Sequence, residues 1–407
     1  MGRLQYFDMA RRPRVALLSG TFSTYSRDLI HGIHDYLREH KPWSIYLGEY
    51  GRGESLPNWL QRWAGNGIVA RVENVKIART IVKTGLPTVD VSFGLEHSPF
   101  PRVIMDNLAI TKLAAEHLLE RGFTHFGYCG ENQHHWSRSR QDLFVRHIQT
   151  AGHSVRSFEG VGRQNARYAW ELELDAIFKW LRELPKPVGI MACHDKRGQQ
   201  VLEACRRLDI PVPDEVAVIG VHNDELLCEL CDPPLSSVVS NARRVGYEAA
   251  ALLVQMMAGQ RVPAQDYLFE PVGVATRQST DVVAVTDVQI SKAIRFIREH
   301  ACDGITVDDV LHAVPMSRTV FERRFKKLLN RTPHDQILRV RIERVKTLLV
   351  GTNLTLQQIA ERTGFGHIEY LSVAFKRAVG DPPSSYRKRE RGLPAAMMMA
   401  YRNNSGV

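Results

Sequence analysis

The stretch from Arg344 to Arg387, RVKTLLVGTNLTLQQIAERTGFGHIEYLSVAFKRAVGDPPSSYR, carries the strongest structural signal in this chain of 407 residues. Leu356 and Ile359 lie at helical spacing and predict a short helix. Gly364 predicts a tight turn, because glycine adopts left-handed backbone angles at little cost. A longer helix is expected over 367–379. Two helices joined by such a turn form a helix-turn-helix.

The same arrangement is expected some 49 residues earlier in the chain. Thr306 begins a short helix that ends before Pro315, and Ser317 suits the N-cap of a second helix that reaches about Leu329. A long helix over 333–349 lies between the two units. It would hold them about one DNA turn, or roughly 34 Å, apart.

Exposed side chains of the two second helices are the candidate DNA contacts. In a helix-turn-helix the second helix enters the major groove, where its first residues meet base edges and its later Lys and Arg residues meet phosphates. For each residue a base contact, a phosphate contact and plain solvation remain open. The predicted DNA-binding residues are Ser317, Arg318, Thr319, Arg323, Lys326, His367, Glu369, Ser372, Lys376 and Arg377.

Positive charge gathers in the same part of the chain. Residues 282–407 hold 21 Lys and Arg against 12 Asp and Glu, whereas residues 1–281 hold 33 against 32. A basic segment joined to a nearly neutral one is expected of a nucleic-acid-binding domain, although an anionic membrane surface would also attract it. The charge and the paired motifs together favour double-stranded DNA as the partner.

The first 280 residues alternate buried-type strands with amphipathic helices, which predicts an α/β fold with parallel sheets covered on both faces. Strands are predicted at 15–19, 67–70, 87–91, 103–105, 126–129, 189–192, 216–221 and 237–239. Helices are predicted at 27–39, 110–121, 139–151, 169–183, 198–208 and 243–258. We therefore expect an α/β domain at 1–280, an all-α domain with two helix-turn-helix units at 281–390 and a disordered tail at 391–407.

Several other features narrow the class of protein. The apolar run at 15–18 is too short for a signal peptide, and no run approaches the roughly 18 residues of a membrane span, so a cytoplasmic, nucleoid-associated protein without membrane contact is expected. The six cysteines are expected to be reduced. Cys228 and Cys231 lack a second ligand pair, so no metal and no cofactor are predicted. The GxSxG, HExxH and GxxxxGK[ST] motifs are missing, and we predict no catalytic residues and no enzyme activity.

The stretch over 344–387 closely resembles the signature of AraC-type regulators. The residues that fall at that family's spacing are Ile359-Ala360, Gly364-Phe365, Phe375-Lys376, Gly380 and Pro383 with Tyr386-Arg387. Leu371 replaces the family's usual aromatic residue. Val373 occupies an often polar position and is not among the predicted base contacts.

The first domain resembles the effector domain of LacI-type repressors and sugar-binding proteins, through PPLSSVVSNARRVGYEAAALLVQMMAG at 233–259 and RQST at 277–280. This implies a periplasmic-binding-protein-like (type I) sensor of two doubly wound lobes, with the ligand in the cleft between them. The C-terminal domain replaces the DNA-binding segment that usually precedes such a sensor. The whole arrangement resembles the XylR-like family of xylose operon regulators over about 14–387. It implies a homodimeric activator of a pentose operon that binds an operator, a small sugar such as xylose, and RNA polymerase.

Polar residues that follow predicted strands are the candidate effector contacts. A pyranose needs carboxylates, amides and Arg for its hydroxyls, and an aromatic face for its C–H side. The predicted effector-binding residues are Tyr25, Arg27, Asp106, Arg140, Asp195, His222, Asn223 and Asp224. The resemblance places all of these except Arg27 at effector-contact positions, and ordinary helix capping is the alternative for the Asp and Asn residues.

One of these residues departs from the resemblance. His222 stands where the family commonly has Asp, and a ring with one donor and one acceptor does not reproduce a carboxylate. A different small-molecule effector, and repression in place of activation, therefore stay as alternatives.

Two other classes of protein are alternatives to a regulator. AraC-type tails are also fused to DNA-repair methyltransferases, but the sequence ACHD around Cys193 places an acid where those enzymes need a thiol-activating setting. A stand-alone sugar-binding protein of a transport system would need an export signal and would lack the paired helix-turn-helix units.

Overall fold

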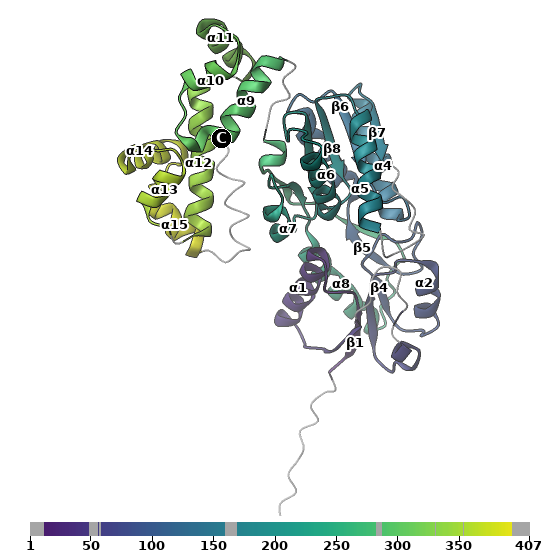
Figure 1. The fold of residues 1–407 in the computed structure, drawn as a ribbon. Helices are drawn as coiled ribbons and strands as arrows, with labels where there is room; N and C mark the ends of the chain where they lie inside the picture. Colours follow the sequence, from purple (N-terminus) through teal and green to yellow (C-terminus); the bar gives the residue numbers. More distant parts are fainter. Residues whose placement is uncertain are drawn as a thin grey trace, which may run out of the picture. The chain divides into compact units, whose positions relative to one another are not determined.

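The computed structural model describes residues 12–48, 56, 58–158, 169–281, 287–329, 331–352 and 354–392. The chain divides into two compact units, Met1–Ala284 and Val285–Val407, each of which is described by itself (Figure 1). Of the tail predicted to be disordered, residues 391 and 392 end the last helix, and 393–407 lie outside the described residues. Among the described helices, none has the length and apolar character needed to span a membrane.

The first unit is built from parallel strands that alternate with helices. Its strands are β1 Arg14–Leu18, β2 Ser44–Gly48, β3 Gly67–Ala70, β4 Thr88–Asp90, β5 Arg102–Met105, β6 His125–Cys129, β7 Val155–Phe158, β8 Val188–Ala192, β9 Val216–Val221, β10 Ser236–Val239, β11 Asp266–Phe269 and β12 Gly273–Ala275. Its helices are α1 Thr24–Glu39, η1 Asn58–Arg62, α2 Val75–Val82, α3 Asn107–Leu119, α4 His135–Thr150, α5 Ala169–Glu183, α6 Asp195–Arg207, α7 Glu225–Leu230, α8 Ala242–Met257 and η2 Gln278–Thr280.

These elements form two lobes, each around a six-stranded sheet. Lobe 1 has the strand order β11-β5-β4-β3-β1-β2, and lobe 2 has the order β12-β10-β9-β8-β6-β7, with β12 antiparallel to β10. The α/β, doubly wound prediction is confirmed. Every predicted strand is present within one residue of its expected ends. The predictions missed β2, β7, β11 and β12, which are the edge strands of the two sheets.

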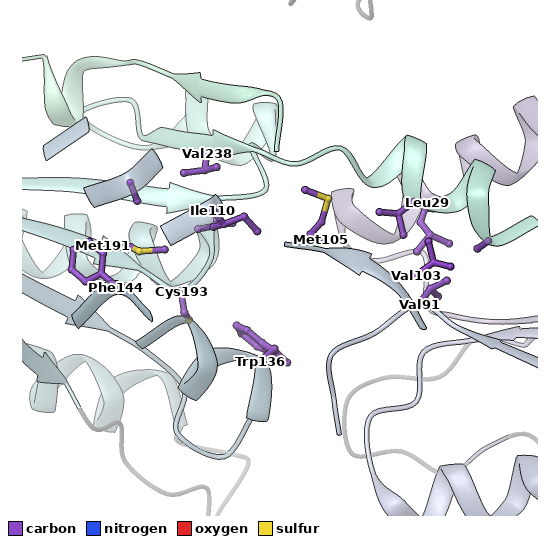
Figure 2. Packing of buried hydrophobic residues seen from close by; sticks show 14 of the residues in the cluster. Leu29, Val91, Val103, Met105, Ile110, Trp136, Phe144, Met191, Cys193 and Val238 are labelled. Carbon is purple, nitrogen blue, oxygen red and sulfur yellow. The ribbon is translucent and has the colours of Figure 1, made fainter. Parts of the chain in front are cut away.

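The chain passes between the lobes three times, after β5, after β10 and after β11, because α3 packs on lobe 2 and α8 on lobe 1. Backbone bonds join these crossings: Asp106 N donates to Phe269 O at 2.8 Å, and Val272 N donates to Val239 O at 2.9 Å. Figure 2 shows Met105, at the first crossing, between the labelled apolar residues of the two lobes. One apolar core therefore continues through the crossings.

Helices α1 and α8 lie side by side on lobe 1 with their backbones in direct contact (Figure 1). A Cβ added at Gly32 would collide with the Arg243 carbonyl, and one added at Gly246 would collide with the Leu29 carbonyl. Each helix therefore places a glycine where the other helix passes closest. This packing fixes α1, whose first turn carries Tyr25.

The second unit is entirely helical. Its helices are α9 Val288–His300, η3 Ala301–Asp303, α10 Val307–Ala313, α11 Arg318–Leu329, α12 Pro333–Gly351, α13 Leu356–Arg362, α14 Ile368–Val379 and α15 Pro383–Gly392. The pairs α10–α11 and α13–α14 are the two predicted helix-turn-helix units, and α12 is the predicted linking helix. Arg341 of α12 is buried and donates to Ala301 O at 2.7 Å and to Ile305 O at 2.8 Å. Its guanidinium also lies 5.9 Å from the Phe365 ring, so one residue contacts both the segment that precedes α10 and the turn between α13 and α14.

Candidate functional site

Arg140, in the second turn of α4, is the centre of a polar cluster that the fold buries in the first unit. Its Nε donates to Asn107 Oδ1 at 2.9 Å, and its Nη1 donates to Cys193 O at 2.6 Å. Nη1 also lies 3.4 Å from His222 Nε2. Because a guanidinium can only donate, any hydrogen bond in this contact has His222 Nε2 as its acceptor. The ends of β8 and β9 and the start of α3 therefore meet at Arg140.

Tyr25 brings lobe 1 to this cluster. Its ring centroid lies 4.9 Å from that of His222, and the Arg71 guanidinium lies 5.9 Å from the Tyr25 ring. Arg71 Nη1 donates to Ser26 Oγ at 3.0 Å, and Nη2 pairs with Glu73 at 2.8 Å. Burial raises the pKa of Tyr25, so its hydroxyl stays protonated at neutral pH. The Tyr25–His222 contact joins the two lobes at the site.

Asp90 is a candidate site residue that the sequence predictions missed. It ends β4, is fully buried, and lies near enough to Tyr25 that a charge on it would add to the effect of burial in raising the pKa of Tyr25. Its Oδ1 accepts hydrogen bonds from Val72 N at 3.2 Å, Ser92 N at 2.9 Å and Ser92 Oγ at 2.9 Å. The rule that selected Asp106 and Asp195, an acid at the end of a buried strand, applies equally to Asp90 in the predicted strand 87–91.

Asp195 holds the loop that carries His222. Its Oδ1 accepts from Ser237 Oγ at 2.5 Å, and its Oδ2 accepts from Asp224 N at 2.7 Å. His222 and Asn223 both have positive φ values, 99° and 53°, which side chains other than glycine adopt at a cost. The Asp195 bonds offset that cost and fix the loop. Direct contact between Asp195 and an effector stays a prediction.

The remaining predicted effector residues have local roles in the structure. Asp106 Oδ1 accepts from Leu108 N at 2.7 Å and caps α3, and Asp224 Oδ1 accepts from Leu227 N at 3.3 Å and caps α7. Arg27 is exposed and donates to Thr21 O and Thr24 Oγ1, within its own turn of chain. Effector contact for these three residues stays a prediction. The structure itself brings Tyr25, Arg140 and His222 together.

The last residues of the first unit are tied to the same loop and to α3. Arg277 Nη1 donates to Asn223 Oδ1 at 2.8 Å, and its Nε pairs with Glu229 at 2.7 Å. Thr280 Oγ1 lies 2.7 Å from His117 Nε2, and its carbonyl accepts from Arg121 Nε at 2.7 Å. Residues 277–280, which we call the exit clamp, therefore connect the site to the end of the unit.

Buried thiols near the site are not activated. Burial raises the pKa of Cys193 to about 12 and that of Cys231 to about 11. A nucleophilic or metal-binding cysteine needs a lowered pKa. Within the described residues, no group of three or more His, Cys, Asp or Glu residues could hold a metal ion.

The predicted DNA-binding residues lie on the outer sides of α11 and α14 and in the residues that start them. All of them are exposed except Ser372, which is half-buried. Phe325 and Phe375 are fully buried on the opposite sides of the two helices. Arg318 pairs with Asp308 and with Glu322, both at 2.9 Å. Because these pairs are exposed, they restrain Arg318 only weakly.

Comparison with known proteins identifies the family. Residues 14–107 match the XylR N-terminal domain, residues 115–280 a periplasmic binding protein-like domain, and residues 310–389 a helix-turn-helix domain. The xylose operon regulatory protein of Escherichia coli K12 is 33% identical over 385 residues, which are 93% of this chain and 97% of that protein. The chain belongs to the xylose operon regulator family.

Two further comparisons agree with this family. The xylose operon regulatory protein of Haemophilus influenzae is 33% identical over 383 residues, covering 92% of this chain and 98% of that protein. The solved structure of the xylose-binding transcription activator xylR has a TM-score of 0.78 and 31% identity, covering 93% of this chain and 98% of that one. As a member of the xylose operon regulator family, the chain is a DNA-binding transcription regulator with a sensor domain and is not an enzyme. The predicted family, fold class and general function are confirmed.

We expect the contribution of Asp90 to stability to depend on pH in this regulator. Burial raises the pKa of Asp90 to about 7. Its unfolded value is about 4, so its favourable contribution is complete below about pH 4 and is lost as pH rises to about 7. The free energy of unfolding of the wild type, minus that of Asp90→Asn, should therefore fall across this range and level off above it. Urea unfolding at a series of pH values measures this difference.

The comparison with Asp90→Asn removes the opposing contribution of His117. Burial lowers the pKa of His117 to about 3, so the folded state loses stability as pH falls below about 6.5 in both proteins. That loss cancels in the difference. A difference that stays constant from pH 4.5 to pH 8 would contradict the raised pKa of Asp90.

Proposed function

We propose that this chain is a homodimeric, cytoplasmic regulator that binds D-xylose, or a closely related pentose, between the lobes of its first unit. The observation that carries the proposal is the buried cluster in which Tyr25 of lobe 1 meets Arg140 and His222 of lobe 2. Support comes from relatives over more than nine-tenths of the chain that are xylose operon regulatory proteins. The bound form activates a pentose operon.

The cluster supplies the chemistry that a pentose requires. The Arg140 guanidinium donates to sugar oxygens, the Asn107 amide both donates and accepts, and the Asp90 carboxylate accepts from hydroxyls. The faces of Tyr25 and Trp136 suit the C–H side of a sugar ring. Trp136 already lies 5.4 Å from the Arg140 guanidinium, which places an aromatic ring beside the donors.

Sugar binding would act by favouring a closed arrangement of the two lobes. Closure displaces the loop at 222–224 or α3. The exit clamp at 277–280 is joined to that loop at Asn223 and to the last turn of α3 at His117. The change would reach the paired helix-turn-helix units of a homodimer, set their spacing on an operator in the nucleoid, and allow recruitment of RNA polymerase. Lobe closure, its transmission to the helix-turn-helix units and the effect on DNA binding go beyond the family assignment, and each can be tested.

His222 favours a second candidate, a regulator of the same class with another effector. Its Nε2 lies 3.4 Å from Arg140 Nη1, at a position where the family resemblance leads us to expect an acid. A sugar that offers a donor at this point in a different orientation would then bind better than xylose. Repression in place of activation is the corresponding alternative for the output.

Thermal unfolding of the full chain with D-xylose, L-arabinose, D-ribose and D-glucose tests the proposal. A sugar present at about 100 times its Kd should stabilise the protein by about 2.7 kcal/mol. Stabilisation by D-xylose supports the first candidate, and stabilisation by another pentose alone supports the second. No stabilisation by any monosaccharide would contradict both. Selection from a randomised duplex pool, with and without the stabilising sugar, then tests sequence-specific DNA binding.

A further inference from the structure

The two second helices carry different chemistry at the same position of the motif. The helices α11 and α14 can be aligned by adding 50 to the residue numbers of α11. The first backbone hydrogen bond of α11, from Phe321 N to Ser317 O, then falls on the first one of α14, from Leu371 N to His367 O. The fully buried Phe321 and Leu371 then coincide, as do the next buried residues one turn later in each helix. The two helices therefore correspond at these core-facing positions.

The same shift places Val373 on Arg323. Both side chains are exposed, and Arg323 is one of the predicted DNA-binding residues. A position that carries a guanidinium in the first unit thus carries an isopropyl group in the second. The two units cannot recognise the same base with these residues.

Val373 belongs to an apolar patch on α14. It is 67% exposed, and Tyr370, one turn earlier, is 45% exposed. Among the large apolar side chains that the structure describes beyond residue 287, Leu328 is the other exposed one, at 37%. Two of the three therefore share one side of a single helix, whereas the other large apolar side chains that the structure describes in this unit are wholly or partly buried.

The charges around the patch indicate what covers it. Lys376 and Arg377 are exposed on the next turn of the same helix, and the second unit has a strong excess of positive charge. Basic side chains at this distance reach phosphates while the residues one turn earlier face the floor of the major groove. The apolar group that the major groove presents there is the C5-methyl of thymine.

We infer that Val373, flanked by Tyr370, is a specificity-determining residue that contacts a thymine methyl group. Arg323 at the corresponding position of the first unit contacts guanine, the base that Arg recognises most often. The inference rests on the proposed DNA-binding function and deepens it. It makes the two halves of each binding site chemically different, with guanine under α11 and thymine under α14.

Replacement of thymine by uracil tests this directly, because uracil lacks only the methyl group. The full chain is used to select a duplex from a randomised pool, and that duplex is resynthesised with deoxyuridine at each thymine in turn. Fluorescence anisotropy then gives the Kd of each duplex. For wild type we expect about a fourfold loss of affinity at one or two thymines, the effect of one buried methyl-sized group.

Three variants locate the effect. With Val373→Ala the thymine-to-uracil ratio should fall close to one at the same thymine, and Val373→Thr, which keeps one methyl, should retain most of the ratio. Leu328→Ala, at the other exposed apolar residue, should leave the ratio unchanged. A wild-type ratio of one at every thymine, or a full ratio in Val373→Ala, would overturn the inference while leaving DNA binding intact. Failure to select any duplex would instead contradict the proposed function.

Discussion

Replacing Arg140 by Ala is expected to abolish the response to the sugar, with at least about a 100-fold loss of affinity. Arg140 is buried and contacts Asn107, Cys193 O and His222 through one guanidinium. Truncation removes a donor that we propose for the sugar and leaves buried acceptors without it, a change expected to cost about 3 kcal/mol or more. Isothermal titration with the sugar found in the thermal panel measures the loss.

Two further variants separate loss of the contact from general damage to α4. Arg140→Lys keeps the charge but not the fork of donors, so its affinity should fall between those of wild type and Arg140→Ala. Arg146→Ala removes an exposed Arg of the same helix and should bind as wild type does. Near-normal affinity in a folded Arg140→Ala protein would remove Arg140 from the site.

Gly246→Ala is expected to destabilise the first unit by about 3 kcal/mol. The added Cβ would collide with the Leu29 carbonyl, which belongs to helical backbone and cannot rotate away as a flexible side chain can. The helices α1 and α8 would have to separate, and α1 carries Tyr25. Sugar affinity should therefore fall together with stability. Urea unfolding of the full chain, followed at a signal of the first unit, gives the stability change.

Gly85→Ala is the matched control for that substitution. Gly85 has a positive φ of 66°, but nothing lies within 4 Å of an added Cβ. Its replacement should cost only the backbone strain, about 1 kcal/mol. Equal effects of the two substitutions would show that α1 and α8 can separate at no cost and would contradict the close packing described above.

The difference between the strands that the sequence predicts and those that it misses is physical. Central strands such as β8 and β9 are covered on both faces, so nearly every residue is apolar and the run is easy to recognise. The edge strands β2 and β11 leave residues such as Tyr46 and Leu268 exposed, and their composition resembles that of loops. The order of the strands within each sheet follows from long-range pairing, which local periodicity does not contain.

The site residues also divide into those that the local sequence predicts and those that depend on long-range packing. His222 directly follows a predicted strand and Arg140 lies at the start of a predicted helix, so both could be chosen from the sequence. Asp90, at the end of a predicted strand, could have been chosen as His222 was. The contact between Tyr25 and His222 could not be predicted in this way, because about 200 residues of chain separate them and only the packing of two lobes brings them together. The use of Asp195 as a loop anchor depends on Ser237, whose role appears only when β10 is paired with β9.

The exit clamp also determines where this sensor can be cut and rejoined. Because Arg277 holds Asn223 and Thr280 holds α3, residues 277–280 belong to the sensor's own fold even though they lie at its boundary. A biosensor that joins this sensor to a fluorescent protein or to another DNA-binding domain should keep the chain through Asp281 and vary only the residues beyond it. A junction placed before Arg277 would remove the bonds that hold the loop at 222–224, and we expect it to disconnect sensing from any output attached to the sensor.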